Sequence, residues 1–183
     1  MSNLHTTFIN TTNHKIIKNT ITNKEIFRSH TIDEEVFFDG GVMITETDIK
    51  GIITYANNKF IDMTGFSKEE LIGSPHSINR HPDMPKGVFR GMWKTISSRK
   101  TWQGYMKNLR KDGRYYWVIV YIQPRIDTNN NLIGYAAGRK IASREAIKEI
   151  EEEYAKHYGD EHIADKFFLG GELCLGPQLA TRV

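Results

Sequence analysis

Cysteine is nearly absent from this chain of 183 residues, which has only Cys174. A single thiol can form no disulfide within the chain and cannot build a cysteine-based metal cage, so any redox chemistry needs another device. Long apolar runs are missing too. The apolar stretch from Trp117 to Ile122 is among the longest and has six residues, whereas a helix needs about 20 apolar residues to cross a bilayer. The polar start lacks the features of a secretory signal, so we expect a cytoplasmic protein without direct membrane insertion.

An excess of one charge is also missing. The chain has 25 Lys and Arg residues against 22 Asp and Glu residues, a formal net charge of +3, and no dense basic run. Nucleic-acid binding is therefore not expected, because it needs a row of cations to neutralise phosphates. The hydrophobic share of 39% and the charged share of 26% are ordinary for a soluble globular chain. The length favours one domain with tails.

The first part of the chain divides into a tail, a hairpin and two short helices. Residues 1–32 are polar without a sustained period, which predicts a loose or locally helical tail, with order beginning near Asp33. Apolar and β-branched residues on both sides of the turn at 48–51 predict a β-hairpin. Two short helices are expected next, because Ser67 and Glu70 have the spacing of a capping box.

The second half predicts one longer helix, three strands and a final helix. Val88, Met92 and Ile96 have helical spacing after a proline-punctuated loop. Strands are predicted over 101–110, 114–126 and 131–142, separated by turn residues. The fold class is therefore α+β, a five-stranded antiparallel sheet with helices covering one face. Residues 33–142 form the predicted folded domain. Residues 143–183 form an acidic amphipathic helix and a C-terminal tail.

Several motifs in the predicted domain are similar to those of a known family. The run TYANNKFIDMTGFSKEELIG resembles the first half of a PAS domain, with an Asn before F-x-x-x-T-G-F and E-x-L-x-G. More specific are the RHPDMP sequence at 80–85, the W-x-G at 102–104 and the KNLRKDG turn at 107–113. Together these resemble the flavin-binding PAS domain of bacterial aerotaxis receptors and of their soluble relatives in bipartite energy-taxis systems. The resemblance covers about residues 41–142.

This resemblance implies FAD held non-covalently between the sheet and the helices, and signalling through a partner rather than catalytic turnover. The cofactor-binding residues that it implies are Asn57, His76, Arg80, His81, Asp83, Trp102 and Asn108, with Phe89 and Trp93 as pocket wall or core. Those receptors continue into a membrane segment and a long coiled coil, which this chain lacks. We therefore expect a separate output protein, the cytoplasmic part of a membrane-bound chemotaxis receptor, with a homodimer as the alternative.

The same residues are suited to FAD by their chemistry. FAD needs an apolar slot with aromatic contacts, hydrogen-bond partners for its ring edge, and positive charge for its pyrophosphate. Trp102 and Phe89 can contact the ring, and the amides of Asn57 and Asn108 can pair with its heteroatoms. Arg80 is suited to two phosphate oxygens because its guanidinium is planar and charged. The loop before the predicted helix also offers free N–H groups to an anion.

Each of these residues has an ordinary structural alternative. Trp102 can fill the core, as aromatic residues on strands commonly do. Arg80 and Asp83 can pair with each other, and Asp83 is better suited to cap the helix than to touch a pyrophosphate that would repel it. His76 and His81 can be loop histidines without a ligand.

The predicted function is a cytoplasmic redox or energy sensor, with two alternatives. The first is a PAS module without a cofactor that mediates dimerisation or docking. The second is a haem sensor in which His76 or His81 is the axial ligand. Blue-light adduct chemistry would need a cysteine beside the ring, and Cys174 lies beyond the domain. No clustered zinc ligands and no hydrolase or kinase motif are visible, so we do not expect an enzyme.

Overall fold

Five strands form one antiparallel sheet in the computed structural model, which describes residues 14–156, 168–169 and 172–173. The strands are β3 (Met43–Thr47), β4 (Ile53–Ala56), β5 (Trp102–Leu109), β6 (Tyr115–Ile126) and β7 (Leu132–Lys140). Their order across the sheet is β4-β3-β7-β6-β5, and every neighbouring pair is antiparallel. The predicted fold class, an α+β PAS fold with a five-stranded sheet, is confirmed.

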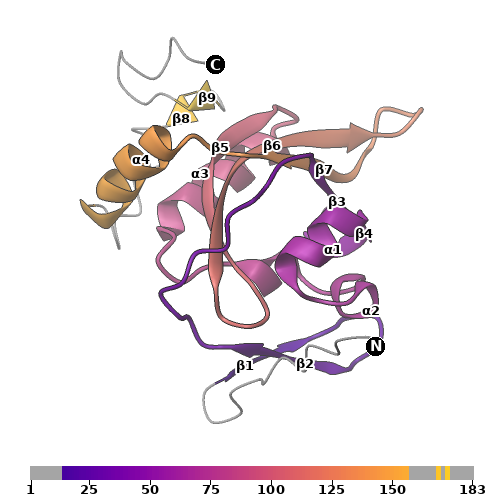
Figure 1. Cartoon of the computed structure of the whole chain (residues 1–183). Coiled ribbons are helices and arrows are strands. Elements are labelled where there is room, and N and C mark those ends of the chain that lie inside the picture. Colours follow the sequence, from indigo (N-terminus) through magenta and orange to yellow (C-terminus); the bar gives the residue numbers. More distant parts are fainter. Residues whose placement is uncertain (1–13, 157–167, 170–171, 174–183) are drawn as a thin grey trace.

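Four helices follow β4 in the chain and precede β5 (Figure 1). They are α1 (Asn58–Thr64), α2 (Lys68–Leu71), the 3-10 helix η1 (His76–Asn79) and α3 (Lys86–Ser97). The predicted capping box is present, because Ser67 accepts a hydrogen bond from Glu70 N and the Glu70 carboxylate accepts one from Ser67 N. Gly65 ends α1 with a φ of 74°, a left-handed conformation that glycine adopts without strain.

The two faces of the sheet differ because side chains alternate along a strand. On β5, Met106 and Asn108 lie on the inner face, where they line a cavity together with residues of α3. Lys107, between them, lies on the outer face, where its ammonium pairs with Glu151 of the last described helix. The inner face holds the core, with fully buried side chains such as Phe60 and Val120.

The N-terminal residues that the structure describes form a hairpin, so the prediction of a loose or helical tail before Asp33 is wrong for them. Strands β1 (His14–Lys18) and β2 (Glu25–Ser29) pair antiparallel and lie beside α2 (Figure 1). The hairpin is joined to the domain by Thr20 N donating to Gly73 O and by Arg28. Ile17 and Ile26, which pair across the hairpin, are buried, and so are Asn19 and Arg28, each two residues further along the chain, a two-residue period that the polar residue types obscure in the sequence.

The acidic helix α4 (Arg144–Lys156) packs on the outer face of the sheet. Its four buried residues are the ones that the sequence places on one side: Ala146, Ile147, Ile150 and Tyr154. The Tyr154 ring stacks on Trp117 at 6.3 Å, and its hydroxyl donates to Tyr105 O at 3.0 Å. The apolar side of α4 is therefore occupied within this chain.

A short pair, β8 (Phe168–Leu169) and β9 (Glu172–Leu173), completes the described elements. Most of the predicted C-terminal tail, including Cys174, and residues 1–13 of the predicted N-terminal tail lie outside the described residues. Among the described residues, no helix combines the length and the apolar character that crossing a membrane requires.

Candidate ligand-binding site

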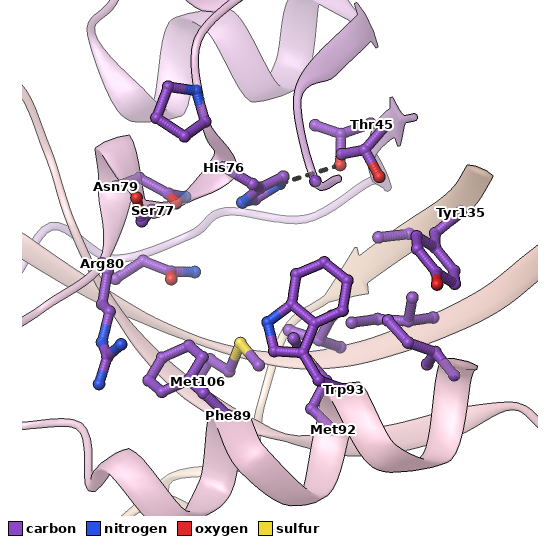
Figure 2. A pocket seen from close by; sticks show the side chains of 18 of the residues that line it. Thr45, His76, Ser77, Asn79, Arg80, Phe89, Met92, Trp93, Met106 and Tyr135 are labelled. Atoms are coloured by element: carbon purple, nitrogen blue, oxygen red, sulfur yellow. Dashed lines mark hydrogen bonds between the residues drawn. The ribbon is translucent and has the colours of Figure 1, made fainter. Parts of the chain in front are cut away.

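A cavity of about 280 Å³ lies between the inner face of the sheet and the helices. Figure 2 shows its two sides: His76 and Asn79 project from the η1 segment, while Phe89, Met92 and Trp93 project from α3. The remaining lining comes mainly from the inner positions of β3, β5, β6 and β7. The wall is thus largely apolar in area, with polar side chains contributed by several of these elements, which is a common composition of a small-molecule site.

Arg139 on β7 is the buried cation of this cavity. Its guanidinium donates to Thr45 Oγ1 at 3.0 Å and to His76 Nε2 at 2.7 Å, and it lies 4.9 Å from the centre of the Phe60 ring. Burial lowers the pKa of Arg139 to about 10, so the group stays protonated at neutral pH. No carboxylate pairs with it among the described residues. A buried charge without an opposite charge is unfavourable, so this cavity favours a negatively charged or electron-rich ligand group.

His76 is held in its neutral form. The Thr45 hydroxyl lies 3.2 Å from His76 Nε2 (Figure 2). The same nitrogen accepts from Arg139, so the ring proton belongs on Nδ1. Burial, and then the positive charge of Arg139, lower the pKa of His76 to about 3. At neutral pH His76 therefore adds no positive charge and serves to orient Arg139.

Asn108 offers an unused donor to the cavity. It is 5% exposed, and its Nδ2 makes no hydrogen bond of ordinary geometry among the described residues, although the side chain interacts with the Tyr116 hydroxyl. Nearby, Asn79 donates to the hydroxyl of the fully buried Tyr116 at 3.3 Å. Because a buried amide without a partner is costly, Asn108 is arranged for an acceptor that a ligand would bring.

Arg80 and Trp93 flank the cavity at different places along its wall. The Arg80 guanidinium stacks on the Phe89 ring at 3.8 Å, which holds the cation at the cavity while leaving its N–H groups to an anion. Trp93 meets Tyr135 edge to face at 5.6 Å and covers Gly51. Gly51 has a φ of 80°, and a Cβ there would lie 2.9 Å from the Trp93 ring, so this close approach requires glycine.

Five of the nine residues proposed from the sequence line this cavity: His76, Arg80, Phe89, Trp93 and Asn108. The other four lie elsewhere. Trp102 is fully buried in the core opposite Ile122. Asn57 caps α1, where its Oδ1 accepts from Phe60 N and Ile44 N, which ties the helix to β3.

His81 and Asp83 face away from the cavity. Asp83 pairs with Lys107 at 3.1 Å and does not cap α3, whose N-cap is Pro85 without a side-chain hydrogen bond. The prediction that Asp83 caps the helix is therefore wrong. His81 accepts from Asp83 N through Nδ1 at 3.2 Å, and burial lowers its pKa to about 4.

Arg139, Thr45 and Asn79 are polar lining residues that the sequence reasoning missed. The signal for Arg139 was its position in the alternation of β7. It lies two residues after Ala137 and four after Tyr135, both of which face inward, so it faces inward too. An arginine at an inward position of a half-buried strand is unusual enough to mark a site. Thr45 and Asn79 carried no comparable signal, because small polar residues are common on strands and loops.

Comparison with known proteins identifies relatives of this region. Residues 53–137 match the family model described as PAS fold. The chain is 38% identical to the aerotaxis receptor of Escherichia coli (strain K12) over 116 residues, which are 63% of this chain and 23% of that receptor. It is 32% identical to the nitrogen fixation regulatory protein of Klebsiella pneumoniae over 102 residues, 56% of this chain and 21% of that protein. The chain thus spans less than a quarter of the length of these two relatives.

Solved structures share the fold. A light-oxygen-voltage domain studied with a flavin analogue matches with a TM-score of 0.54 at 20% identity, over 65% of this chain and 89% of that one. The PAS domain of a protein from Colwellia psychrerythraea matches with a TM-score of 0.52 at 23% identity, over 56% of this chain and 87% of that one.

Proposed function

Since residues 53–137 of this chain form a PAS domain, we propose that the chain is a sensor that binds FAD in the cavity and signals its redox state to a partner. The observation that carries the proposal is the buried Arg139 guanidinium, which faces the cavity without a carboxylate partner among the described residues. A flavin ring is a suitable occupant because it gains negative charge on reduction, which this cation favours.

The residues that line the cavity fit the parts of FAD. The volume of about 280 Å³ is at the lower limit for ligand pockets, which are typically about 300–1,000 Å³, and suits the ring system rather than the whole dinucleotide. Phe89, Met92 and Met106 would provide apolar contacts to the ring, and Asn108 Nδ2 would donate to an acceptor on its edge. Arg80, stacked on Phe89, would hold phosphate oxygens.

Bound FAD would supply reversible electron transfer. The side chains around the cavity would interact differently with the oxidised and the reduced ring, because the charge of the ring differs. Arg139 holds a positive charge beside the cavity, and neutral His76 fixes its orientation. Lining side chains from four strands and α3 would respond to the same charge, so two redox states can favour two arrangements of the domain.

The partner that we propose is the cytoplasmic part of a membrane chemotaxis receptor. The similarity to the aerotaxis receptor supports this assignment. Since the apolar side of α4 is buried within the chain, docking would use the outer face of the sheet around Tyr121 instead of Ile147 and Ile150. A pull-down from native membranes should recover a receptor, and Tyr121→Arg should weaken recovery without releasing FAD. Recovery of no membrane protein would refute this partner.

The absorption spectrum tests the proposed cofactor. Protein purified under mild conditions should show flavin bands at about 375 and about 450 nm, since the cofactor determines these positions. Released chromophore should be identified as FAD. A colourless protein that also takes up no added FAD would refute the proposal and favour the cofactor-free docking module.

Haem is a weaker candidate for this cavity. His76 is the histidine that lines the cavity, and its Nε2 is already engaged by Arg139 and Thr45. His81 faces the other side of the loop, with Asp83 and Tyr115 as neighbours. Neither histidine therefore presents a free ring nitrogen to the cavity that could bind the haem iron as an axial ligand.

A further inference from the structure

Lys107 bridges two segments on the outer face of the sheet. Its Nζ lies 3.1 Å from Asp83 Oδ2, in the loop before α3, and 3.6 Å from Glu151 Oε1 on α4. The same ammonium lies 4.2 Å from the centre of the Tyr115 ring. One cation thus joins the loop that carries the RHPDMP sequence to the last helix of the domain.

The burial of this lysine distinguishes it from an ordinary surface ion pair. The Lys107 side chain is 10% exposed, whereas the side chains of Asp83 and Glu151 are 62% and 51% exposed. Either carboxylate can be hydrated without its partner, whereas the buried ammonium is stabilised by both: it donates a hydrogen bond to Asp83 and has Glu151 as a second, more distant anion. Undocking of α4 would therefore remove one of the two carboxylates that stabilise Lys107.

The same strand and loop also form part of the cavity. Asn108, adjacent to Lys107, lines the cavity, and its backbone forms an isolated bridge with Arg80, which also lines it. In addition, Lys107 N–H donates to Met84 Sδ at 3.3 Å. The segments 80–84 and 107–108 are thus joined to each other, with the cavity on one side and α4 on the other.

From this geometry we propose that Lys107 is a positioning residue that couples the docking of α4 to the cavity. With α4 docked, Glu151 adds a second carboxylate to Lys107, which steadies this part of β5 and with it the adjacent Asn108, whose Nδ2 is available to the ligand. Ligand binding and α4 docking then favour each other by the same factor, because coupling free energies are reciprocal. The inference rests on the proposed function for the identity of the ligand, FAD.

Ligand-free protein tests the coupling without reference to FAD. In the full chain labelled with ¹⁵N, Glu151→Gln should speed amide exchange in α4 about two- to fivefold, the range expected for one exposed partner of an ion pair. It should also shift the side-chain amide resonance of Asn108. Exposed Glu152 provides the matched control, and Glu152→Gln should change neither. Lys107→Arg, which keeps the cation, should preserve both signals, whereas Lys107→Met, which keeps the aliphatic stem, should change both.

FAD binding provides the reciprocal measurement. Lys107→Met and Glu151→Gln should weaken FAD binding by at most the factor by which they loosen α4, and added FAD should slow α4 exchange in the unsubstituted protein. Faster α4 exchange with an unmoved Asn108 resonance would overturn the coupling, because the bridge would then be merely structural. Unchanged α4 exchange in both variants would overturn it as well. If the unsubstituted protein takes up no FAD, the proposed function fails, while the Asn108 resonance still decides the coupling.

Discussion

Arg139 is the residue on which the electrostatics of the cavity depend most, since it is a fully buried cation held by a hydroxyl, a carbonyl and a neutral imidazole. Arg139→Met keeps an unbranched side chain and removes the charge. We expect FAD binding to weaken about 10- to 100-fold, because a hydrogen bond to a charged group contributes about 1.5–3 kcal/mol. The midpoint potential of bound flavin should fall, because the positive charge stabilises the reduced, more negative ring. Titration with FAD and spectroelectrochemistry measure the two effects.

Lys140 provides the control for this substitution. It follows Arg139 on β7 and is exposed, so Lys140→Met changes the net charge by the same amount without altering the cavity. It should leave both affinity and potential close to those of the unsubstituted protein. Equal effects of the two substitutions would mean that net charge matters and the buried position of Arg139 does not.

His76 makes the stability of the fold depend on pH. Its pKa is about 3 when folded and about 6.5 when unfolded, so below pH 6.5 the unfolded chain takes up a proton that the folded chain does not. Stability from His76 is therefore complete above pH 6.5 and is lost as the pH falls toward 3, by up to about 1.4 kcal/mol per pH unit. His81, with a pKa of about 4, adds a similar dependence.

Urea denaturation at pH 4.5, 5.5 and 7.5 measures this dependence. His76→Gln keeps an acceptor for Arg139 but cannot titrate, so the free energy of unfolding should fall less steeply between pH 6.5 and 4.5 than in the unsubstituted protein. The remaining slope should come from His81 and the carboxylates. Identical slopes for the two proteins would show that His76 titrates normally in the folded state, in conflict with its burial.

At the scale of elements, the hairpin β1–β2 supports the segment that carries the cavity residues. Arg28 on β2 donates to Ile78 O at 2.8 Å and to Arg80 O at 3.1 Å. Arg28→Met leaves both carbonyls without this donor and should destabilise the fold by about 1–3 kcal/mol. FAD occupancy should also fall, because Arg80 loses its support. Lys15, its exposed cross-strand partner, is the control, and Lys15→Met should change neither the melting temperature nor FAD content.

The helix α4 belongs to the folded domain as an element. Ile150 is fully buried, so Ile150→Ala should cost about 2–4 kcal/mol and lower the melting temperature by about 5–15 °C. Glu152→Ala on the exposed side should leave it within about 1–2 °C. Differential scanning calorimetry compares the two. A normal melting temperature for Ile150→Ala would mean that α4 is not docked in solution and that its apolar side is open to a partner.

At the scale of the whole molecule, ligand binding and stability are linked because the cavity is formed by elements far apart in sequence, from β3 to β7. The unfolded chain cannot assemble this site. FAD at about 100 times its dissociation constant should therefore raise the free energy of unfolding by about 2.7 kcal/mol. Thermal unfolding at increasing FAD concentration measures the effect, and riboflavin, which lacks the phosphates proposed to contact Arg80, should act only at higher concentration. A melting temperature that is independent of FAD would contradict the proposed site.

The sequence by itself determined the elements and the fold class, because those depend on local patterns. The turn residues at 111–113 and 127–131, with the β-branched and aromatic runs on either side of them, specify the three long strands, and Ser67 with Glu70 specifies the start of α2. The proline-containing loop before α3 and the aromatic residues on that helix were likewise visible. Five of the nine proposed site residues line the cavity for the same reason, since they lie on the loop, the helix and the strand that the motifs identified.

Only the tertiary structure decided which polar residues meet. Arg139, Thr45 and His76 come from three elements, and their contacts arise when β7, β3 and η1 pack together, which no spacing along the chain reveals. The same packing buries Arg28 against η1 and joins Lys107 to Glu151 across the outer face. Local patterns determine on which face of a strand or helix a side chain lies. Its partners and its burial depend on contacts between residues distant in sequence, and these contacts set the charge and the chemistry of the cavity.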